Sequence, residues 1–150
     1  MAAQRGEALR VSHVGRGVAV GDYDDDGDPD VLLICVGEPA RLLRNDSGNP
    51  NRWLGVRLVG TRSGRDAIGA RVAVTAGGHT QVRARVGGAS YLTASDPRLL
   101  FGLGRAERVD AIEGRWPSGH VDRFPGTAAG RYVTLTEGGA PPAAAPAKAP

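Results

Sequence analysis

The hydrophobic positions of the chain fall in short segments separated by turns that are rich in glycine and proline. Residues 31–36 form a continuous apolar run with several β-branched side chains, which predicts a buried strand. Residues 68–76 and 81–86 alternate instead, which predicts strands with one solvated face. The side chains expected on the inner face of these two strands are Ile68, Ala70, Val72, Val74, Ala76, Val82, Ala84 and Val86.

Many further short strands are expected along the chain. They lie at 17–20, 40–44, 53–59, 98–103, 109–116, 121–124 and 132–136, with one more framed around 9–11. Turn signals at this spacing are typical of a β-sandwich or barrel, and no segment has a helical pattern. The sequence therefore predicts an all-β fold, in which a hairpin with a charged loop precedes a small sandwich-like or barrel-like module.

The connection between the first two of these strands is strongly acidic. Six of the 16 Asp and Glu residues lie between positions 22 and 30, although the whole chain has a formal net charge of +3. Carboxylates packed this densely repel one another unless a cation lies among them. Their order matches D-x-D-x-D-G-x-x-D, in which alternate carboxylates converge and Gly27 permits the sharp turn. The candidate metal ligands are Asp22, Asp24, Asp26, Asp28 and Asp30, with Asp28 acting through its backbone carbonyl.

The ion expected in this loop is Ca²⁺. All the donors are hard oxygens, and calcium accepts about six to eight of them in a looser geometry than magnesium. Zinc would require His or Cys ligands, and the loop contains neither. The loop is not an EF-hand, because Leu33 occupies the position of the bidentate Glu and no amphipathic helix flanks the loop. The alternative interpretation is a solvated acidic turn without an ion.

The bulk composition limits the classes of partner. Lys148 is the only lysine, and enrichment in Arg, Ala and Gly most simply reflects a GC-rich, bacterial-type genome, so no nucleic-acid partner is expected. No stretch approaches 18 apolar residues, so no membrane insertion is expected, and residues 1–10 lack the apolar core of a signal peptide. The single cysteine, Cys35, excludes an internal disulfide and is expected to be a small buried core residue.

No catalytic motif is found in the sequence. The histidines, His13, His79 and His120, are scattered, and none pairs in sequence with a nucleophile or with a second metal ligand. No serine lies in a G-x-S-x-G frame, and no glycine-rich phosphate loop opens a helix. A role that is not enzymatic is therefore expected.

Two groups of residues offer alternative binding surfaces. Trp53 and Trp116 could stack on a sugar, although packing in the core or at a strand edge is the preferred interpretation. A basic face could attract glycans or polyanions, although a merely solvated strand face is preferred here as well. The arginines of that face would be Arg62, Arg65, Arg71, Arg83 and Arg85.

Two parts of the chain resemble known modules. Residues 15–46, with GVAVGDYDDDGDPDVLL followed by ARLLRND, resemble an FG-GAP (VCBS-type) repeat, which forms blades of calcium-binding β-propellers. Residues 53–137 resemble the ASPIC/UnbV domain through WLGVRL, RDAIGARV, SYL, DPR, FGLG and RWPSG in that order. With the turn formers at 45–51 and the Gly, Ala and Pro composition after residue 137, we expect four parts: a partial repeat at 1–46, a linker turn at 47–52, an ASPIC/UnbV-like β domain at 53–137 and a disordered Ala/Pro tail at 138–150.

This resemblance carries expectations about function. The pair of modules occurs at the C-terminal end of secreted proteins related to cartilage acidic protein, after several FG-GAP repeats. One repeat cannot close a propeller, so we expect the C-terminal piece of a longer protein, or else a free-standing protein whose first residues pack on the β domain. Gly114 stands where the family usually has an apolar residue, and it is expected to loosen its strand locally.

The expected function is that of a calcium-binding, extracellular or periplasmic interaction or adhesion module in which calcium is structural. The partner would be a protein or a glycan that the sequence does not identify. The alternative is a carbohydrate-binding or accessory module of an extracellular enzyme.

Overall fold

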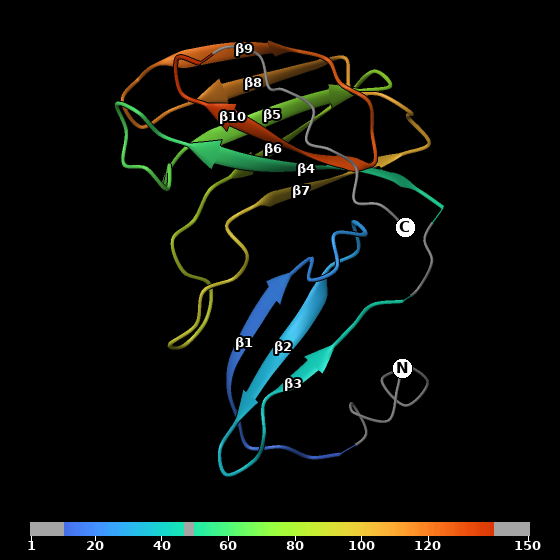
Figure 1. The fold of residues 1–150 in the computed structure, drawn as a ribbon, viewed down its shortest axis with the longest axis vertical. Helices are drawn as coiled ribbons and strands as arrows, with labels where there is room; N and C mark the ends of the chain where they lie inside the picture. The colour runs from blue at the N-terminus through green and yellow to red at the C-terminus, as the bar shows by residue number, and fades with distance from the viewer. Residues whose placement is uncertain (1–10, 47–49, 140–150) are drawn as a thin grey trace. The chain divides into compact units, whose positions relative to one another are not determined.

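The computed structural model describes residues 11–46 and 50–139, and the residues that it describes form strands, turns and loops without a helix (Figure 1). They belong to two compact units. The first unit comprises Met1–Ser47 together with Gly88–Asp96, and the second comprises Gly48–Gly87 together with Pro97–Pro150. The all-β prediction is confirmed. Within the described residues, no helix has the length and hydrophobicity that a membrane span requires.

The first unit is built on one antiparallel sheet. Its strands β1 (Gly15–Gly21), β2 (Asp30–Cys35) and β3 (Arg41–Leu43) lie in sequence order. The acidic loop joins β1 to β2, and the pairing of Gly21 with Asp30 closes its base. The expected hairpin is therefore present, with the loop held between two paired strand ends.

Both faces of this sheet are apolar. Cross-strand pairing places Ala19, Leu32 and Leu42 in one row, and Val20, Val31 and Leu43 in a row on the opposite face. Several apolar side chains of the three strands remain more than a third exposed, among them Val18, Val20, Leu32, Ile34 and Leu42. Within the described part of the unit, Cys35 is the only buried hydrophobic side chain. The sheet therefore has no hydrophobic core of its own.

Residues 88–96 cover the free edge of β1. The backbone N–H of Asp96 donates to the carbonyl of Val20 at 2.9 Å, and the Thr93 hydroxyl donates to the carbonyl of Val18 at 3.1 Å. A Cβ on Gly17 would lie 2.6 Å from Cγ2 of Thr93, so glycine is required for this close approach. The segment thus satisfies backbone groups that an open strand edge would leave unpaired.

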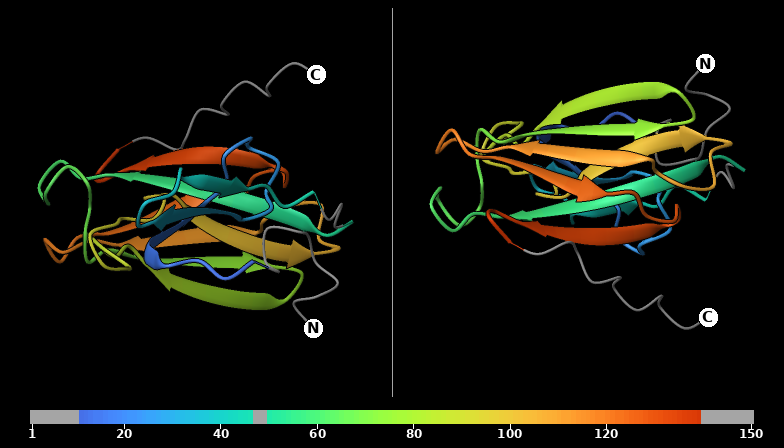
Figure 2. Two further views of the ribbon diagram at one scale, coloured as in Figure 1. Left: turned by 90° about the horizontal axis from the view of Figure 1, so that it is seen from below. Right: turned by 90° about the horizontal axis from the view of Figure 1, so that it is seen from above.

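The second unit is a β-sandwich of two sheets. One sheet has the order β10-β4-β7, with β4 (Arg52–Val59) parallel to β10 (Arg131–Thr136) and antiparallel to β7 (Leu99–Gly104). The other sheet is antiparallel and has the order β6-β5-β8-β9. Its strands are β5 (Arg71–Ala76), β6 (His79–Ala84), β8 (Ala111–Arg115) and β9 (Val121–Pro125). Figure 2 shows the two sheets as separate layers.

The hydrophobic core of the molecule's described part lies between these two sheets. Alternate residues of β4, β5 and β10 point inward, as their burial patterns show. The largest fully buried side chains come from both layers: Phe101, Leu54, Ile112, Leu135, Val56, Val72, Val74, Val109 and Val133. The expected inner face of residues 70–76 is confirmed, whereas Ile68 lies in a turn before β5 and is 55% exposed.

The expected orientation of β6 is wrong. Val82 pairs with Ala73 on the outer face and is 62% exposed, whereas Gln81 and Arg83 lie on the side of the buried Val72 and Val74. The strand is at the edge of its sheet, where a long polar side chain can cover apolar surface and still reach a polar partner. Accordingly, Arg83 lies over the Phe101 ring and Gln81 donates to the carbonyl of Gly102.

Three further expectations concern Gly114, the strand expected around residues 9–11 and the C-terminal tail. Gly114 does not interrupt its strand, because its pairing runs in register from Val72 on one side to Asp122 on the other. Of the strand expected around 9–11, residues 9 and 10 lie outside the described residues and Val11 lies in a bend. The expected tail lies outside the described residues from position 140 onward.

Candidate metal centre

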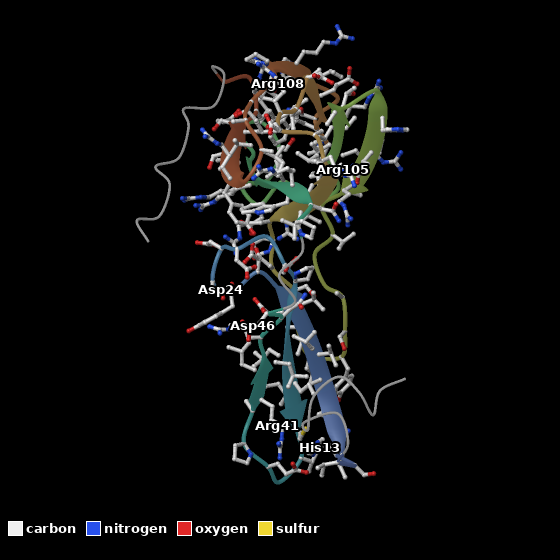
Figure 3. The ribbon with its side chains drawn as sticks, turned by 90° about the vertical axis from the view of Figure 1, so that its right-hand side faces the viewer. His13, Asp24, Arg41, Asp46, Arg105 and Arg108 are labelled. Carbon is white, nitrogen blue, oxygen red and sulfur yellow. The ribbon has the colours of Figure 1, made fainter. Side chains whose placement is uncertain are left out.

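The loop between β1 and β2 brings three carboxylates together. One oxygen each from Asp22, Asp24 and Asp30 lies within 4.8 Å of the others, so these three residues could hold a metal ion. Asp22 and Asp30 are 5% and 2% exposed, and they are two of the three buried charged residues in the described chain. In Figure 3 the labelled Asp24 projects from this loop at one end of the sheet of the first unit.

The Asp22 carboxylate is hydrogen-bonded by the backbone of the loop that follows it. Its two carboxylate oxygens accept hydrogen bonds from the backbone N–H groups of Asp26 at 3.0 Å and Gly27 at 2.8 Å. Gly27 has a φ of 92°, which a glycine adopts without steric cost, and Asp25 also has a positive φ of 62°. The predicted turn at Gly27 is present, and it folds the chain back over the first carboxylate.

Asp30 fixes the other side of the loop. One of its oxygens accepts a hydrogen bond from the backbone N–H of Tyr23 at 2.8 Å, and the other accepts one from the N–H of Asn45 at 2.7 Å. This carboxylate therefore ties the start of the loop to the segment after β3. Each oxygen has a second lone pair, so these bonds leave capacity for a ligand.

Asp24 provides the least satisfied oxygen of the group. Its Oδ1 is buried and has no hydrogen-bond partner, while its Oδ2 lies 3.9 Å from Nε of Arg44. Arg44 is bound more closely by Asp46 at 2.6 Å, and this hydrogen bond is the main cause that raises the pKa of its guanidinium. An orphaned carboxylate oxygen among three converging acids fits a cation.

Two of the five predicted ligands lie outside this group of three. Asp26 is exposed, and its Oδ1 accepts a hydrogen bond from the backbone N–H of Asp28 at 2.8 Å. Asp28 was expected to act through its backbone carbonyl rather than its side chain. The ligand roles of Asp26 and Asp28 therefore remain predictions.

Two of the three histidines have carboxylate partners in space that their scattered positions in the sequence do not indicate. Nδ1 of His13 lies 2.8 Å from Oε2 of Glu38, and Nε2 of His120 lies 3.0 Å from Oδ1 of Asp122. The first pair is separated by 25 positions, so only the hairpin register could have revealed it. In the second pair, His120 lies immediately before β9 and Asp122 lies within it, and residues two apart in extended chain share a face, so this pair could have been found from sequence.

The two tryptophans differ in exposure. Trp116 is 4% exposed, and its indole N–H donates to Asp122 at 2.7 Å, so it is a core residue as preferred. Trp53 is partly buried, and its ring centroid lies 5.1 Å from that of Tyr132 on the neighbouring strand. The Tyr132 ring in turn lies beneath the guanidinium of Arg98, at 4.1 Å. Trp116 therefore offers no surface for a sugar.

Comparison with known proteins places the chain in a family. The family model described as ASPIC and UnbV matches residues 60–142. Cartilage acidic protein 1 of Mus musculus and of Homo sapiens are each 36% identical to the chain over 120 residues, and that of Xenopus tropicalis is 33% identical. These matches cover 77% of the chain but only 18% of each relative's length. On the strength of the family match, the chain belongs to the ASPIC and UnbV family.

Proposed function

We propose that the loop of residues 22–30 binds one structural Ca²⁺. The observation that carries this proposal is the convergence of Asp22, Asp24 and Asp30, together with the orphaned Oδ1 of Asp24. Three carboxylates leave a surplus of negative charge that a divalent cation and the nearby Arg44 would balance. Bound calcium would join the two ends of the loop and so hold β1 and β2 in register.

The choice of calcium rests on the donors. The group contains only carboxylate oxygens, with no nitrogen or sulfur that would favour zinc or copper. The loop provides backbone carbonyls and further Asp side chains to extend the shell, as calcium's irregular coordination allows. Asp26 and the carbonyl of Asp28 are the proposed additional ligands.

We also propose that the first unit is an FG-GAP-type blade and that the chain is the C-terminal part of a larger extracellular interaction protein. The support is a sheet that is apolar on both faces and has no core of its own, as expected of a blade packed between neighbours. The chain also spans only 18% of the length of the relatives that it matches. The partner would be a protein or a glycan.

The second candidate is a carbohydrate-binding or accessory module. The partly buried pair of Trp53 and Tyr132, with Arg98 above it, is the observation that favours it. Burial of Trp116 removes the other tryptophan. Calcium binding at the loop is therefore the property to test first.

The test is thermal unfolding of the full chain in EDTA and in about 10 mM calcium. Extracellular modules bind calcium with a Kd of about 10⁻⁴–10⁻³ M, so this concentration should stabilise the first unit by about 1.4–2.7 kcal/mol. We expect the wild-type midpoint to rise by several degrees and the Asp24→Ala midpoint to stay unchanged. Asp66→Ala, in an exposed loop of the second unit, is the matched control and should respond as the wild type does.

Magnesium at the same concentration should give a smaller shift, since magnesium demands a near-octahedral shell and gives up its water ligands reluctantly. If calcium leaves the wild-type midpoint unmoved, or moves Asp24→Ala equally, the loop is a plain acidic turn and the proposal fails.

A further inference from the structure

We propose that His13, Cys35 and Glu38 form a second metal site, of a different chemical class, which takes Zn²⁺ or a similar transition-metal ion. One ligand atom from each residue lies within 4.8 Å of the other two. The site belongs to the first unit and lies at the end of its sheet opposite the acidic loop, as the labelled His13 and Asp24 show in Figure 3.

The hairpin register builds this cluster. Gly15 pairs with Cys35, and just beyond it the N–H of Val36 donates to the carbonyl of Val14 at 2.9 Å. This pairing places His13 beside the C-terminal end of β2. Gly37 then turns the chain with a φ of 72° and returns Glu38 to the same place. His13, which is distant in sequence, therefore meets Cys35 and Glu38 at the open end of the hairpin.

Two residues of the cluster are largely buried, and the third is partly open to solvent. Cys35 is 8% exposed and the His13 side chain 11%, whereas the Glu38 side chain is 32% exposed. Nδ1 of His13 lies 2.8 Å from Glu38, but its Nε2 is buried and has no hydrogen-bond partner. A buried ring nitrogen without a partner is costly, and coordination to a metal would satisfy one nitrogen and leave the other for a hydrogen bond.

The donor set selects the class of metal. Sulfur and nitrogen donors disfavour calcium and magnesium, and the mixture of thiolate, imidazole and carboxylate suits zinc. In a tetrahedral zinc site the ligand atoms are about 3.3–3.7 Å apart, given the usual zinc–ligand distances. The three ligand atoms lie within 4.8 Å of one another and would adjust to this spacing on binding. Three protein ligands leave the fourth position to water.

Charge balance also favours a divalent ion. On binding, the Cys35 thiol releases its proton to solvent, and the thiolate and the Glu38 carboxylate together neutralise the two positive charges. Nη2 of Arg41 lies 3.2 Å from Oε2 of Glu38, so it would orient the carboxylate as an outer partner of the site. Without a metal, the hydrogen bond between His13 and Glu38 leaves Nε2 of His13 unsatisfied.

The test is titration of the full chain with Co²⁺ in the presence of saturating calcium and a phosphine reductant. Cobalt replaces zinc in such sites, and a thiolate ligand gives a charge-transfer absorption in the near ultraviolet. We expect one Co²⁺ per chain with this absorption, and its displacement by one equivalent of Zn²⁺. Cys35→Ser should abolish the absorption, and His13→Ala and Glu38→Gln should each weaken binding at least tenfold.

His79→Ala is the matched control, because His79 is an exposed histidine at the start of β6 in the second unit, and it should bind as the wild type does. Circular dichroism of each metal-free variant checks folding. If Cys35→Ser fails to fold, Glu38→Gln, at a partly exposed position, carries the test. Absence of the charge-transfer absorption in the wild type overturns the proposal. The proposal also fails if His13→Ala and Glu38→Gln both reach half of the full absorption at the same Co²⁺ concentration as the wild type, because the thiol then binds the metal alone.

Discussion

At the residue scale, Gly114 occupies a position that accepts a larger side chain. A Cβ built there would lie 3.6 Å from Nε1 of Trp116 and 3.7 Å from Cε2 of Phe124, which are ordinary contacts. The residue is buried inside β8, and both neighbouring strands pair through it without a shift. The backbone at this position does not require glycine, and glycine lowers the stability of the strand because it loses more conformational entropy on folding than alanine does.

We therefore predict that Gly114→Ala stabilises the second unit by about 0.5–1 kcal/mol. Urea unfolding followed by tryptophan fluorescence measures this, since Trp53 and Trp116 both belong to that unit. Gly126→Ala is the contrasting variant, because its Cβ would lie 2.2 Å from the backbone carbonyl oxygen of Val109 and should destabilise the unit. Equal loss of stability in both variants would contradict the account of Gly114.

At the element scale, one buried carboxylate holds a loop to the end of β10. Oε2 of Glu137 accepts hydrogen bonds from the backbone N–H groups of Thr61, Arg62 and Ser63 at 2.9, 2.8 and 2.7 Å, and its Oε1 accepts from the hydroxyls of Ser63 and Ser118. Burial raises the pKa of Glu137, but these hydrogen bonds lower it more, so its pKa lies well below the ordinary value of 4.5.

This arrangement predicts how the stability of the second unit depends on pH. The folded-state pKa of Glu137 is below the unfolded one, so its contribution is fully present above pH 4.5 and is lost as the pH falls further. We expect Glu137→Gln to be less stable than the wild type at pH 7 and to lose less stability between pH 5 and pH 3. Urea midpoints across this range measure both effects. The exposed Glu107→Gln should behave as the wild type does, and a parallel decline of all three proteins would refute the prediction.

At the scale of the whole molecule, the two units differ in what stabilises them. The second has a core drawn from both layers of a sandwich, whereas the sheet of the first buries only Cys35 among its described hydrophobic residues. A three-stranded sheet without such a core depends on other contributions, here the loop, the covering segment and any bound ion.

Hydrogen exchange should separate the two units. We predict that amides of β4, β5 and β8 exchange slowest and that those of β1 to β3 exchange faster by orders of magnitude, because protection follows buried apolar contact. Calcium should slow exchange in the first unit and leave the second unchanged. Uniform protection across both units in EDTA would show that the first sheet is stable by itself.

How much the sequence could predict depended on the range of the interactions involved. The hairpin with its acidic loop and the alternating core of β5 were predictable, since both follow from residues adjacent in the chain. The reversed faces of β6 were not, because an edge strand is oriented by the layer opposite it rather than by its own alternation. Nor was the meeting of His13 with Glu38, which depends on pairing between distant residues.

The segment that covers the edge of β1 has a consequence for how the two units are inherited. Residues 88–96 belong to the first unit although the chain on either side of them belongs to the second. No single cut in the gene can therefore give two complete parts. A recombination event that separates the coding sequence near residue 47 would deprive β1 of the partners that Thr93 and Asp96 supply. We expect the pair to be shuffled, lost or duplicated in evolution as one cassette.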